Sequence, residues 1–520
     1  MKRKLFKVFG VILVVVAILL AGLYFYADNI VKHQLEKTVK TLPKTVAFNY
    51  QDLKVDVIEG TLQVTKPEVV ITEETKNKLQ FHIKLQDFIV EDVKFWEYLV
   101  YNKIHLTELI LQKPEFTYIK KDSLATKTSS DSKSGLNNFS KTIVIDHFNL
   151  NDAKVTIFQG SKDSIYLNTK GVNFEINHLL FNQETALSSI PIQYSDYKIT
   201  TDSLAFQVGE FEKIRIKNMI LSNKAWQIND VEFNTIYSKQ ELSKIIKKER
   251  DHFNLAVDNI IINTPEFGFV NKRFYFKSPE VQLERPILEI FRDKLVADDT
   301  SIKPLYSKML RDLSFDLTLD TLLLNSGDIA YQEKIKYGKH AGEITFDNFN
   351  AKIKNISNTY TAPTKTEIDV NANFMKTAPI HAVWTFDVNN QQDEFEFKAD
   401  IGRLPAYRLN TFVETNLNIR VEGVFNKIYT TIHGNLDRSR FTFDVKYDNI
   451  KVHVLNKRHQ KDKLLSGLAN IFIHKDSKHE NGNFVHHQNK VVRDKTKSVF
   501  NFIWKNVEEG LKESFINRKN

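Results

Sequence analysis

The chain has no cysteine among its 520 residues. Disulfides, thiolate nucleophiles, cysteine-ligated zinc and iron–sulfur clusters are therefore excluded, and so is a lipid-modified N-terminal cysteine. A chain without cysteine suits an oxidising compartment of the cell envelope. Glycine is also modest at 17 residues, whereas phenylalanine reaches 38. This balance indicates wide apolar surfaces joined by turns that are not tightly packed.

Sequence motifs of catalysis are missing as well. The chain has no P-loop, no G-x-G-x-x-G, no H-E-x-x-H and no G-x-S-x-G. One S-x-x-K, Ser130–Lys133, lies in a Ser/Lys/Asp-rich segment, where nothing would desolvate the lysine. The carboxylates are spread among lysines, and no pair is set within an apolar run. We expect no catalytic residue, no cofactor and no enzymatic activity.

Histidine gathers in the C-terminal tail without a metal-binding spacing. His486 and His487 are adjacent, and on a strand their side chains would point to opposite faces, which disfavours chelation of one ion. A solvated polar tail is the expectation, with no metal site. The tail histidines are His453, His459, His474, His479, His486 and His487.

Only one long hydrophobic run occurs, at the N-terminus. Val8–Tyr26 holds nineteen residues without a charge and follows four basic residues. At about 1.5 Å per residue a helix of this length spans about 28 Å, close to one hydrocarbon core. Three aromatic residues close the run, as expected at a membrane interface. The positive-inside rule then places the N-terminus in the cytoplasm and the bulk of the chain across the membrane. A cleaved signal peptide is the alternative, although no convincing cleavage site follows.

Net charge is distributed unevenly. The formal value is +9, with +4 in residues 1–7, +8 in residues 451–520 and −3 in the large middle. Nucleic acid is therefore not an expected partner. Basic ends on an anchored protein more naturally face anionic lipid headgroups.

An eight-residue pattern returns six times: apolar, polar, any, Pro/Ala/Gly, charged, apolar, any, apolar. Each copy joins two period-two segments at one fixed position, where a proline removes a ladder donor or a glycine permits unusual dihedrals. The pattern predicts repeated antiparallel strands, each kinked at that position. The copies are Val64–Ile71, Leu111–Tyr118, Leu150–Ile157, Ile262–Phe269, Phe276–Leu283 and Leu324–Tyr331.

Residues 366–454 show the cleanest alternation of apolar and polar side chains. One apolar and one wet face per strand is typical of an antiparallel sheet. Few helices are expected beside it, namely Lys239–Asp251 and Pro304–Leu313, which is too few to cover a long sheet. A sheet curved into an apolar groove fits this shortage, and a series of β-sandwiches with dry cores fits the pattern equally well. The candidate groove residues are Ile368, Val370, Phe374, Phe395, Phe397, Ile419, Phe441 and Phe443.

The C-terminal segment Lys497–Phe515 has helical rather than strand periodicity. Its apolar stripe predicts an amphipathic helix that either lies on a membrane or closes the end of the sheet, or simply caps the last strands. The stripe consists of Val499, Phe502, Ile503, Val507, Leu511 and Phe515.

These signals predict a mainly β protein with an elongated, curved antiparallel sheet. Its segments are a basic stub and transmembrane anchor (1–27), a juxtamembrane helix ended by Pro43 (28–43), a first β-repeat region (44–121), a mobile linker (122–138), the main β-groove (139–457), a basic His-rich spacer (458–493) and the C-terminal amphipathic helix (494–520).

The anchor, the juxtamembrane helix and the kinked strand Thr61–Ile71 resemble the AsmA-like proteins. The tail stretches Phe441–Lys457 and Lys497–Ser514 are similar to the C-termini of Bacteroidota-type members. The resemblance implies a bacterial inner-membrane-anchored periplasmic protein, related to TamB-type and chorein-type bridge proteins whose β-groove conducts phospholipid. The chain is shorter than the large bridging members. Its expected 20–25 strands, about 4.8 Å apart, would form a groove about 100–120 Å long.

Two functions are therefore expected. The first is binding or transfer of membrane phospholipid along an apolar β-groove, in support of outer-membrane and envelope homeostasis. The alternative is a non-enzymatic assembly or scaffolding factor that binds other envelope proteins through sheet edges.

Overall fold

The computed structural model describes residues 45–515, except 57–58, 73–78, 95–96, 98–99, 102, 121–141, 161–163, 457–474 and 479–482. Of the described residues, 63% lie in strands and 12% in helices. The chain divides into two compact units, residues 1–210 with 214–228, and residues 211–213 with 229–520. The mainly β class predicted from the sequence is confirmed.

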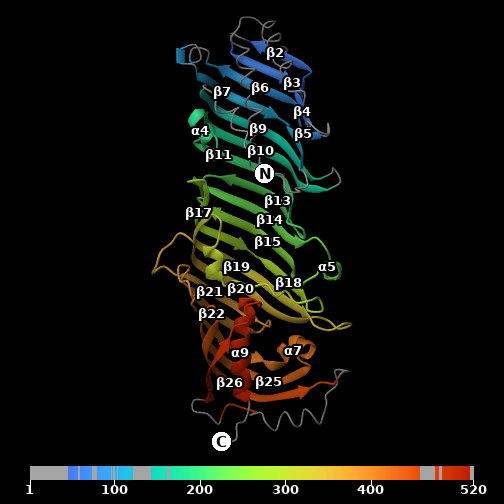
Figure 1. The fold of residues 1–520 in the computed structure, drawn as a ribbon, viewed down its shortest axis with the longest axis vertical. Coiled ribbons are helices and arrows are strands. Elements are labelled where there is room, and N and C mark those ends of the chain that lie inside the picture. Colours follow the sequence, from blue (N-terminus) through green and yellow to red (C-terminus); the bar gives the residue numbers. More distant parts are fainter. Residues whose placement is uncertain are drawn as a thin grey trace. The chain divides into compact units, whose positions relative to one another are not determined.

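The described part of unit 1 is built mainly of strands, with the short helix α4 (Figure 1). Two further strands, β13 (Glu212–Ser222) and β14 (Ala225–Thr235), contribute residues to both units. The elements of unit 1 are β1 (Val46–Asn49), β2 (Asp52–Asp56), β3 (Thr61–Thr65), β4 (Glu68–Thr72), β5 (Leu79–Lys84), β6 (Asp87–Val93), β7 (Lys103–Gln112), β8 (Glu115–Lys120), β9 (Thr142–Gln159), β10 (Ile165–Phe181), α4 (Gln183–Leu187), β11 (Asp196–Thr201) and β12 (Ser203–Val208).

Consecutive strands in unit 1 act as halves of one bent strand. Each of β1/β2, β3/β4, β5/β6 and β7/β8 is separated by only two residues. One arm of the sheet pairs β1 with β4, β4 with β5 and β5 with β8, and the other pairs β2 with β3, β3 with β6 and β6 with β7. Every bend thus carries the chain from one arm to the other.

Unit 2 repeats this plan with longer strands and, among the residues that the structure describes, more helices. Its elements are α5 (Lys239–Ile245), β15 (Asp251–Asn263), β16 (Glu266–Val270), β17 (Arg273–Glu284), β18 (Ile287–Asp293), α6 (Tyr306–Arg311), β19 (Asp316–Lys334), β20 (Gly342–Ser357), β21 (Thr366–Phe374), β22 (Ala378–Phe386), β23 (Phe395–Ile401), β24 (Leu404–Pro405), η1 (Ala406–Leu409), α7 (Asn410–Asn416), β25 (Ile419–Gly434), β26 (Arg438–Val454), β27 (Val485–Val492) and α9 (Val499–Phe515).

The prediction of a purely antiparallel sheet is wrong at two places. β7 and β8 both run parallel to β9, and β17 and β18 both run parallel to β19. In each case the second half of the bent strand, β8 or β18, ends opposite the C-terminal end of the long strand that follows it in sequence. The chain therefore has to return to the other end of the sheet before that long strand can begin, and the pairing is parallel. In unit 2, Asp293 is level with Lys334, whereas β19 begins at Asp316.

The kinks predicted at the repeated motif occur in five of the six copies. The residue before the Pro, Ala or Gly has a positive φ, a region that non-glycine residues seldom adopt. The exception is Phe276–Leu283, where β17 runs straight through and the bend comes at Arg285, before Pro286. The five bent positions are Lys66, Lys113, Asp152, Thr264 and Ser326.

The helices confirm most of the predicted helical segments at shorter length. α5 begins after a capping box, in which Ser238 and Glu241 bond each other's backbone N–H groups. α6 and α9 lie within the predicted segments Pro304–Leu313 and Lys497–Phe515. The sequence analysis did not predict α4 or α7, which are only five and seven residues long.

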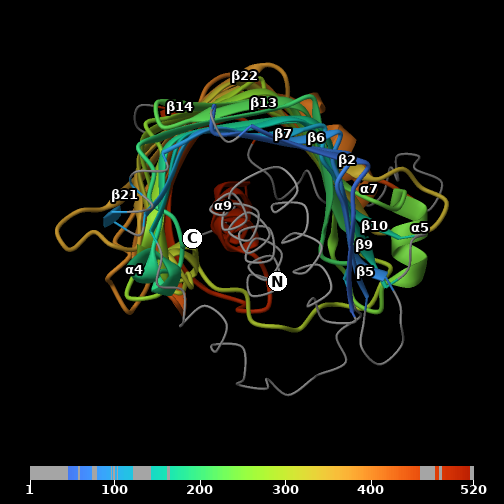
Figure 2. The ribbon, with the colours of Figure 1, turned by 90° about the horizontal axis from the view of Figure 1, so that it is seen from above.

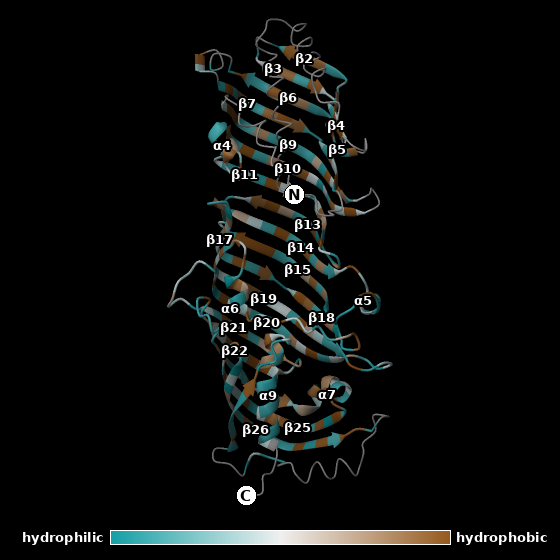
Figure 3. Ribbon diagram, in the orientation of Figure 1, coloured by the Kyte–Doolittle hydropathy of each residue, from teal (hydrophilic) through white to brown (hydrophobic). Residues whose placement is uncertain are grey.

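The main core of unit 2 lies where α9 packs on the last strands. Seen end-on, the strands of this unit curve round α9 (Figure 2). Along the strands, apolar and polar residues alternate (Figure 3), so one face is apolar. We call the face that contacts α9 the inner face. The cluster includes Phe425, Ile432, Phe441, Val445 and Tyr447, joined by Val499 and Phe502 of α9.

Several predicted segments lie outside the described residues. They are the anchor Val8–Tyr26, the juxtamembrane helix 28–43 and the linker 122–138. Among the residues that the structure describes, no helix has the length and apolarity needed to cross a membrane. The C-terminal part of the predicted spacer 458–493 contains β27, which pairs with β26 over eight residues.

Candidate functional site

A row of apolar side chains follows the inner face of unit 2 from strand to strand. In every pair of neighbouring strands the register places the next member directly opposite the last, so all of them share one face. The row consists of Ile262, Val281, Leu322, Ile353, Ile368, Trp384, Phe397, Ile432 and Phe441.

A second row runs beside the first, two residues further along each strand. It consists of Ile260, Leu283, Leu324, Ala351, Val370, Ala382, Ala399, Thr430 and Phe443. The two rows together form an apolar stripe across nine strands. The opposite face carries ion pairs, such as Lys354 with Glu367 at 3.2 Å and Lys398 with Glu396 at 2.6 Å.

The exposure of the stripe changes along its length. From β15 to β21 most members are half-buried, including Ile260, Ile262, Leu322, Ile353 and Val370. From β22 to β26 both rows are largely closed, and Ile432, Phe441 and Phe443 are completely buried. The stripe therefore has an accessible part, which we call the groove (the stripe residues of β15, β17 and β19–β21), and a covered part.

The cover over the last strands is α9, which fits closely. A Cβ atom added to Gly510 would lie 2.5 Å from Cγ of Phe443. The Ser439 hydroxyl donates to Oδ1 of Asn506 at 2.7 Å, and the Tyr447 hydroxyl donates to the carbonyl of Ser514 at 3.2 Å. These are fixed packing contacts, so this end of the stripe is a dry core.

The structure therefore divides the candidate groove residues predicted from the sequence. Phe395, Phe441 and Phe443 belong to the buried core, and Ile368, Phe374, Phe397 and Ile419 pack against it while partly exposed. Ile368 and Val370 also lie in the accessible part of the stripe. The earlier strands β15, β17, β19 and β20 supply the rest of the groove, which the sequence analysis did not single out.

The predicted stripe of α9 is divided in a similar way. Val499 and Phe502 are buried, and Ile503, Val507 and Leu511 pack at the edge of the core. The deepest contacts come instead from the small or polar residues Asn506, Gly510 and Ser514, which hydropathy does not mark. Phe515 ends the helix, and its side chain lies outside the described part of the chain.

An aromatic cluster surrounds Trp384, where the groove meets the core. The ring centroid of Trp384 lies 5.2 Å from that of Tyr306 in α6 and 6.4 Å from that of Phe500 in α9. Phe395 and Phe397 are also neighbours, at 5.8 and 6.2 Å. Trp384 is only 6% exposed, and its Nε1 has no hydrogen-bond partner.

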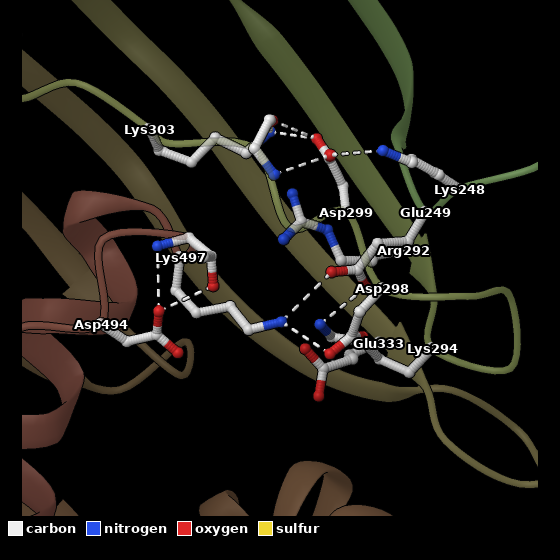
Figure 4. Close-up of polar contacts among 12 residues, drawn as sticks. Lys248, Glu249, Arg292, Lys294, Asp298, Asp299, Lys303, Glu333, Asp494 and Lys497 are labelled. Carbon is white, nitrogen blue, oxygen red and sulfur yellow. Dashed lines mark hydrogen bonds and ion pairs between the residues drawn. The ribbon is translucent and has the colours of Figure 1, made fainter.

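A strap, residues 294–305, connects β18 to α6 and passes across the open side of the curved sheet of unit 2 (Figure 2). It is held by the segment just before α9 (Figure 4). The backbone N–H of Lys303 donates to the carbonyl of Lys495 at 2.8 Å, and the Arg493 guanidinium donates to the carbonyl of Lys303.

Charged side chains reinforce this junction. Nζ of Lys497 lies 3.0 Å from a carboxylate oxygen of Asp298 and 3.5 Å from one of Glu249, and Lys294 contacts Glu249 at 2.7 Å (Figure 4). Burial opposes the charge of Lys497, but its contacts with Asp298 and Glu249 together outweigh this effect and raise its pKa. The same bond lowers the pKa of Asp298.

Beneath the strap the inner face becomes polar. Arg292 binds Asp251 through two hydrogen bonds of 2.7 and 2.6 Å. Burial opposes the charge of Arg292, yet Asp251 holds its pKa above the ordinary value. Burial likewise raises the pKa of Tyr331, whose hydroxyl donates to Glu333 at 2.8 Å. The groove thus has a polar margin whose charges are matched.

The tail histidines within the described residues lie apart from this site. His486 is on β27, and its Nδ1 lies 2.6 Å from Asp444. Nε2 of His453 lies 2.9 Å from Glu422. In the described part of the chain, no three His, Asp or Glu side chains are grouped so as to hold a metal ion. His459 and His479 lie outside it, as does His474.

Comparison with known proteins gives no family assignment. No protein-family model matches the chain, and neither does any curated protein. The function must therefore be inferred from the groove itself.

Proposed function

We propose that this protein binds the acyl chains of membrane phospholipids along the groove of unit 2, and carries or transfers them. The observation that supports the proposal is the half-buried apolar stripe from β15 to β21. Exposed apolar surface of this continuity is uncommon on a protein surface unless something binds there. A hydrocarbon chain needs no polar partner, which matches a surface that offers none along its middle.

The size of the groove suits one acyl chain. The stripe from β15 to β21 crosses five strands, and at about 4.8 Å per strand step this gives about 19 Å. A bilayer's hydrocarbon core of about 30 Å is made by two layers of chains, so each layer spans about 15 Å. The groove is therefore long enough for a single extended chain.

The chain's ends suit a site at a membrane. The N-terminal run Val8–Tyr26 would anchor the protein in a bacterial inner membrane, with the described residues in the periplasm. Lipid would then be close to the groove without a soluble carrier. A role without catalysis is supported by carboxylates that are scattered along the chain, and by His453 and His486, which lie beside the carboxylates of Glu422 and Asp444.

Lipid bound to the purified full-length protein tests the proposal. Extraction and mass spectrometry should recover phospholipid from the wild type. Ile353→Asp places a charge on the inner face and should lower the recovered lipid while the fold, followed by circular dichroism, survives. Lys352→Asp changes the neighbouring residue on the outer face and should leave lipid recovery unchanged. Lipid at the level of an unrelated anchored protein would contradict the proposal.

A further inference from the structure

The indole of Trp384 is anomalous among the inner-face residues of unit 2. The row on which it lies is otherwise made of hydrocarbon and phenyl groups, yet Trp384 brings an N–H donor into the same environment. Burial of a donor without an acceptor is costly, and native structures seldom leave such a group unpaired without a reason. Nε1 of Trp384 has no acceptor in the structure.

A second aromatic residue with a donor group packs on Trp384. Tyr306, at the start of α6, lies with its ring 5.2 Å from Trp384, and its hydroxyl makes no hydrogen bond to another described residue. A tyrosine hydroxyl is protonated at neutral pH and can donate, and burial raises the pKa of Tyr306 further. Both groups sit at the place where the groove reaches the buried core.

Phe500 covers this pair from the side of α9. Its ring lies 6.2 Å from Tyr306 and 6.4 Å from Trp384, but 63% of the residue is exposed. It belongs to the first turn of α9 rather than to the tightly packed part around Gly510. The Phe500 ring can therefore turn aside without disturbing the core.

We propose that Trp384 and Tyr306 hold the acceptor oxygen of an acyl ligand, a carboxylate or an ester carbonyl, while its hydrocarbon chain lies along Ile368, Ile353 and Leu322. This inference rests on the proposed lipid binding and adds the ligand's polar end and its orientation. Indole N–H is a donor only, so the group that it receives must be an acceptor. The neighbouring cation, Arg311, is already bound to Asp393 and to two backbone carbonyls, so the two neutral donors define the recognition.

The test compares three probes on purified full-length protein: oleate, dioleoyl phosphatidylethanolamine in mixed micelles, and octadecane. Trp384→Phe keeps an aromatic ring, although a smaller one, and removes the N–H, and Tyr306→Phe removes only the hydroxyl. Each variant should bind the acceptor-bearing probe about tenfold more weakly, as expected for one lost hydrogen bond in a buried site. Octadecane binding should stay unchanged, and so should all binding to Trp504→Phe, which alters an exposed tryptophan of α9.

The outcomes separate the two proposals. If the two variants bind only oleate more weakly than the wild type does, the ligand group is a free carboxylate. If they also bind the phospholipid more weakly, the ligand group is the ester carbonyl. Equal weakening for octadecane, or none for any probe, would show that Trp384 only packs, and would overturn the inference while lipid binding stands. If the wild type binds none of the three probes, the proposed function itself fails.

Discussion

Gly510 of α9 lies so close to Phe443 of β26 that an added Cβ atom would be 2.5 Å from the Phe443 ring. Phe443 is completely buried and belongs to the core cluster of unit 2. This contact fixes α9 at one distance from the sheet. Because α9 then covers the last strands, the apolar stripe is a core at this end and a groove on the strands before it.

Gly510→Val should therefore destabilise unit 2. The new side chain overpacks a full core, and we expect the free energy of unfolding to fall by about 1–3 kcal/mol. Chemical denaturation measures this change. Glu509→Val introduces the same side chain at the preceding residue of the helix and should lower the free energy of unfolding much less. Equal losses in the two variants would mean that helix propensity, not the contact with Phe443, is responsible.

Asp393 should be essential for the position of α6. Its carboxylate is 1% exposed, accepts a hydrogen bond from Ser307 at 2.8 Å and pairs with Arg311 at 2.8 Å. Asp393→Ala leaves Arg311 without its buried partner, and we expect a loss of about 3–5 kcal/mol in unfolding free energy. Glu394→Ala, an exposed neighbour, should change stability by about 0.5 kcal/mol or less. Similar values for both would refute the anchoring role of Asp393.

The kink at Thr264 should be strained. Its φ of 41° is unfavourable for a β-branched residue, whereas glycine adopts it freely. Thr264→Gly is expected to raise the melting temperature, since relief of about 1–2 kcal/mol exceeds the entropy cost of glycine, about 0.5–1 kcal/mol. Ser278→Gly changes the matching position of the unbent copy and should lower it, because the Ser278 hydroxyl donates to the carbonyl of Asn263 at 2.7 Å. A loss in both variants would contradict strain at Thr264.

His252 should make stability depend on pH. Burial lowers its pKa below 6.5; a hydrogen bond to the carbonyl of Tyr237 opposes this effect, and nearby Lys239 adds to it. A histidine whose pKa is lowered on folding favours the folded state above pH 6.5, and this contribution is lost as the pH falls through the folded-state pKa. The melting temperature should therefore fall less for His252→Gln than for the wild type between pH 7.5 and 5. Parallel curves would exclude the effect.

The strands and kinks that recur along the chain were predicted from the sequence better than the pairings that depend on distant parts of the chain. Period-two alternation and the motif around Lys66, Lys113 and Ser326 depend on local backbone preferences, so strands and kinks could be read directly. Parallel pairing of β17 and β18 with β19 depends on a return of more than twenty residues, which no local pattern records. The antiparallel prediction failed there for this reason.

The position of the groove could not be read from alternation, because a strand has the same pattern under a helix as under a ligand. Phe441 and Phe443 looked like groove residues until α9, more than fifty residues later, was seen to cover them. Trp384 gave no signal either, since only the absence of an acceptor in the folded protein distinguishes it from an ordinary core tryptophan.

Photocrosslinking at two adjacent residues of β19 tests the central claim most directly. Leu322 lies on the inner face, opposite Val281 and Ile353, and Leu323 lies on the outer face, opposite Gln282 and Lys352. With a benzophenone amino acid at Leu322, irradiation of cells should attach phospholipid to the protein, as seen by mass spectrometry of the intact chain. The same probe at Leu323 should attach little or none. Equal lipid attachment at both positions, or none at Leu322, would contradict an acyl chain lying in the groove.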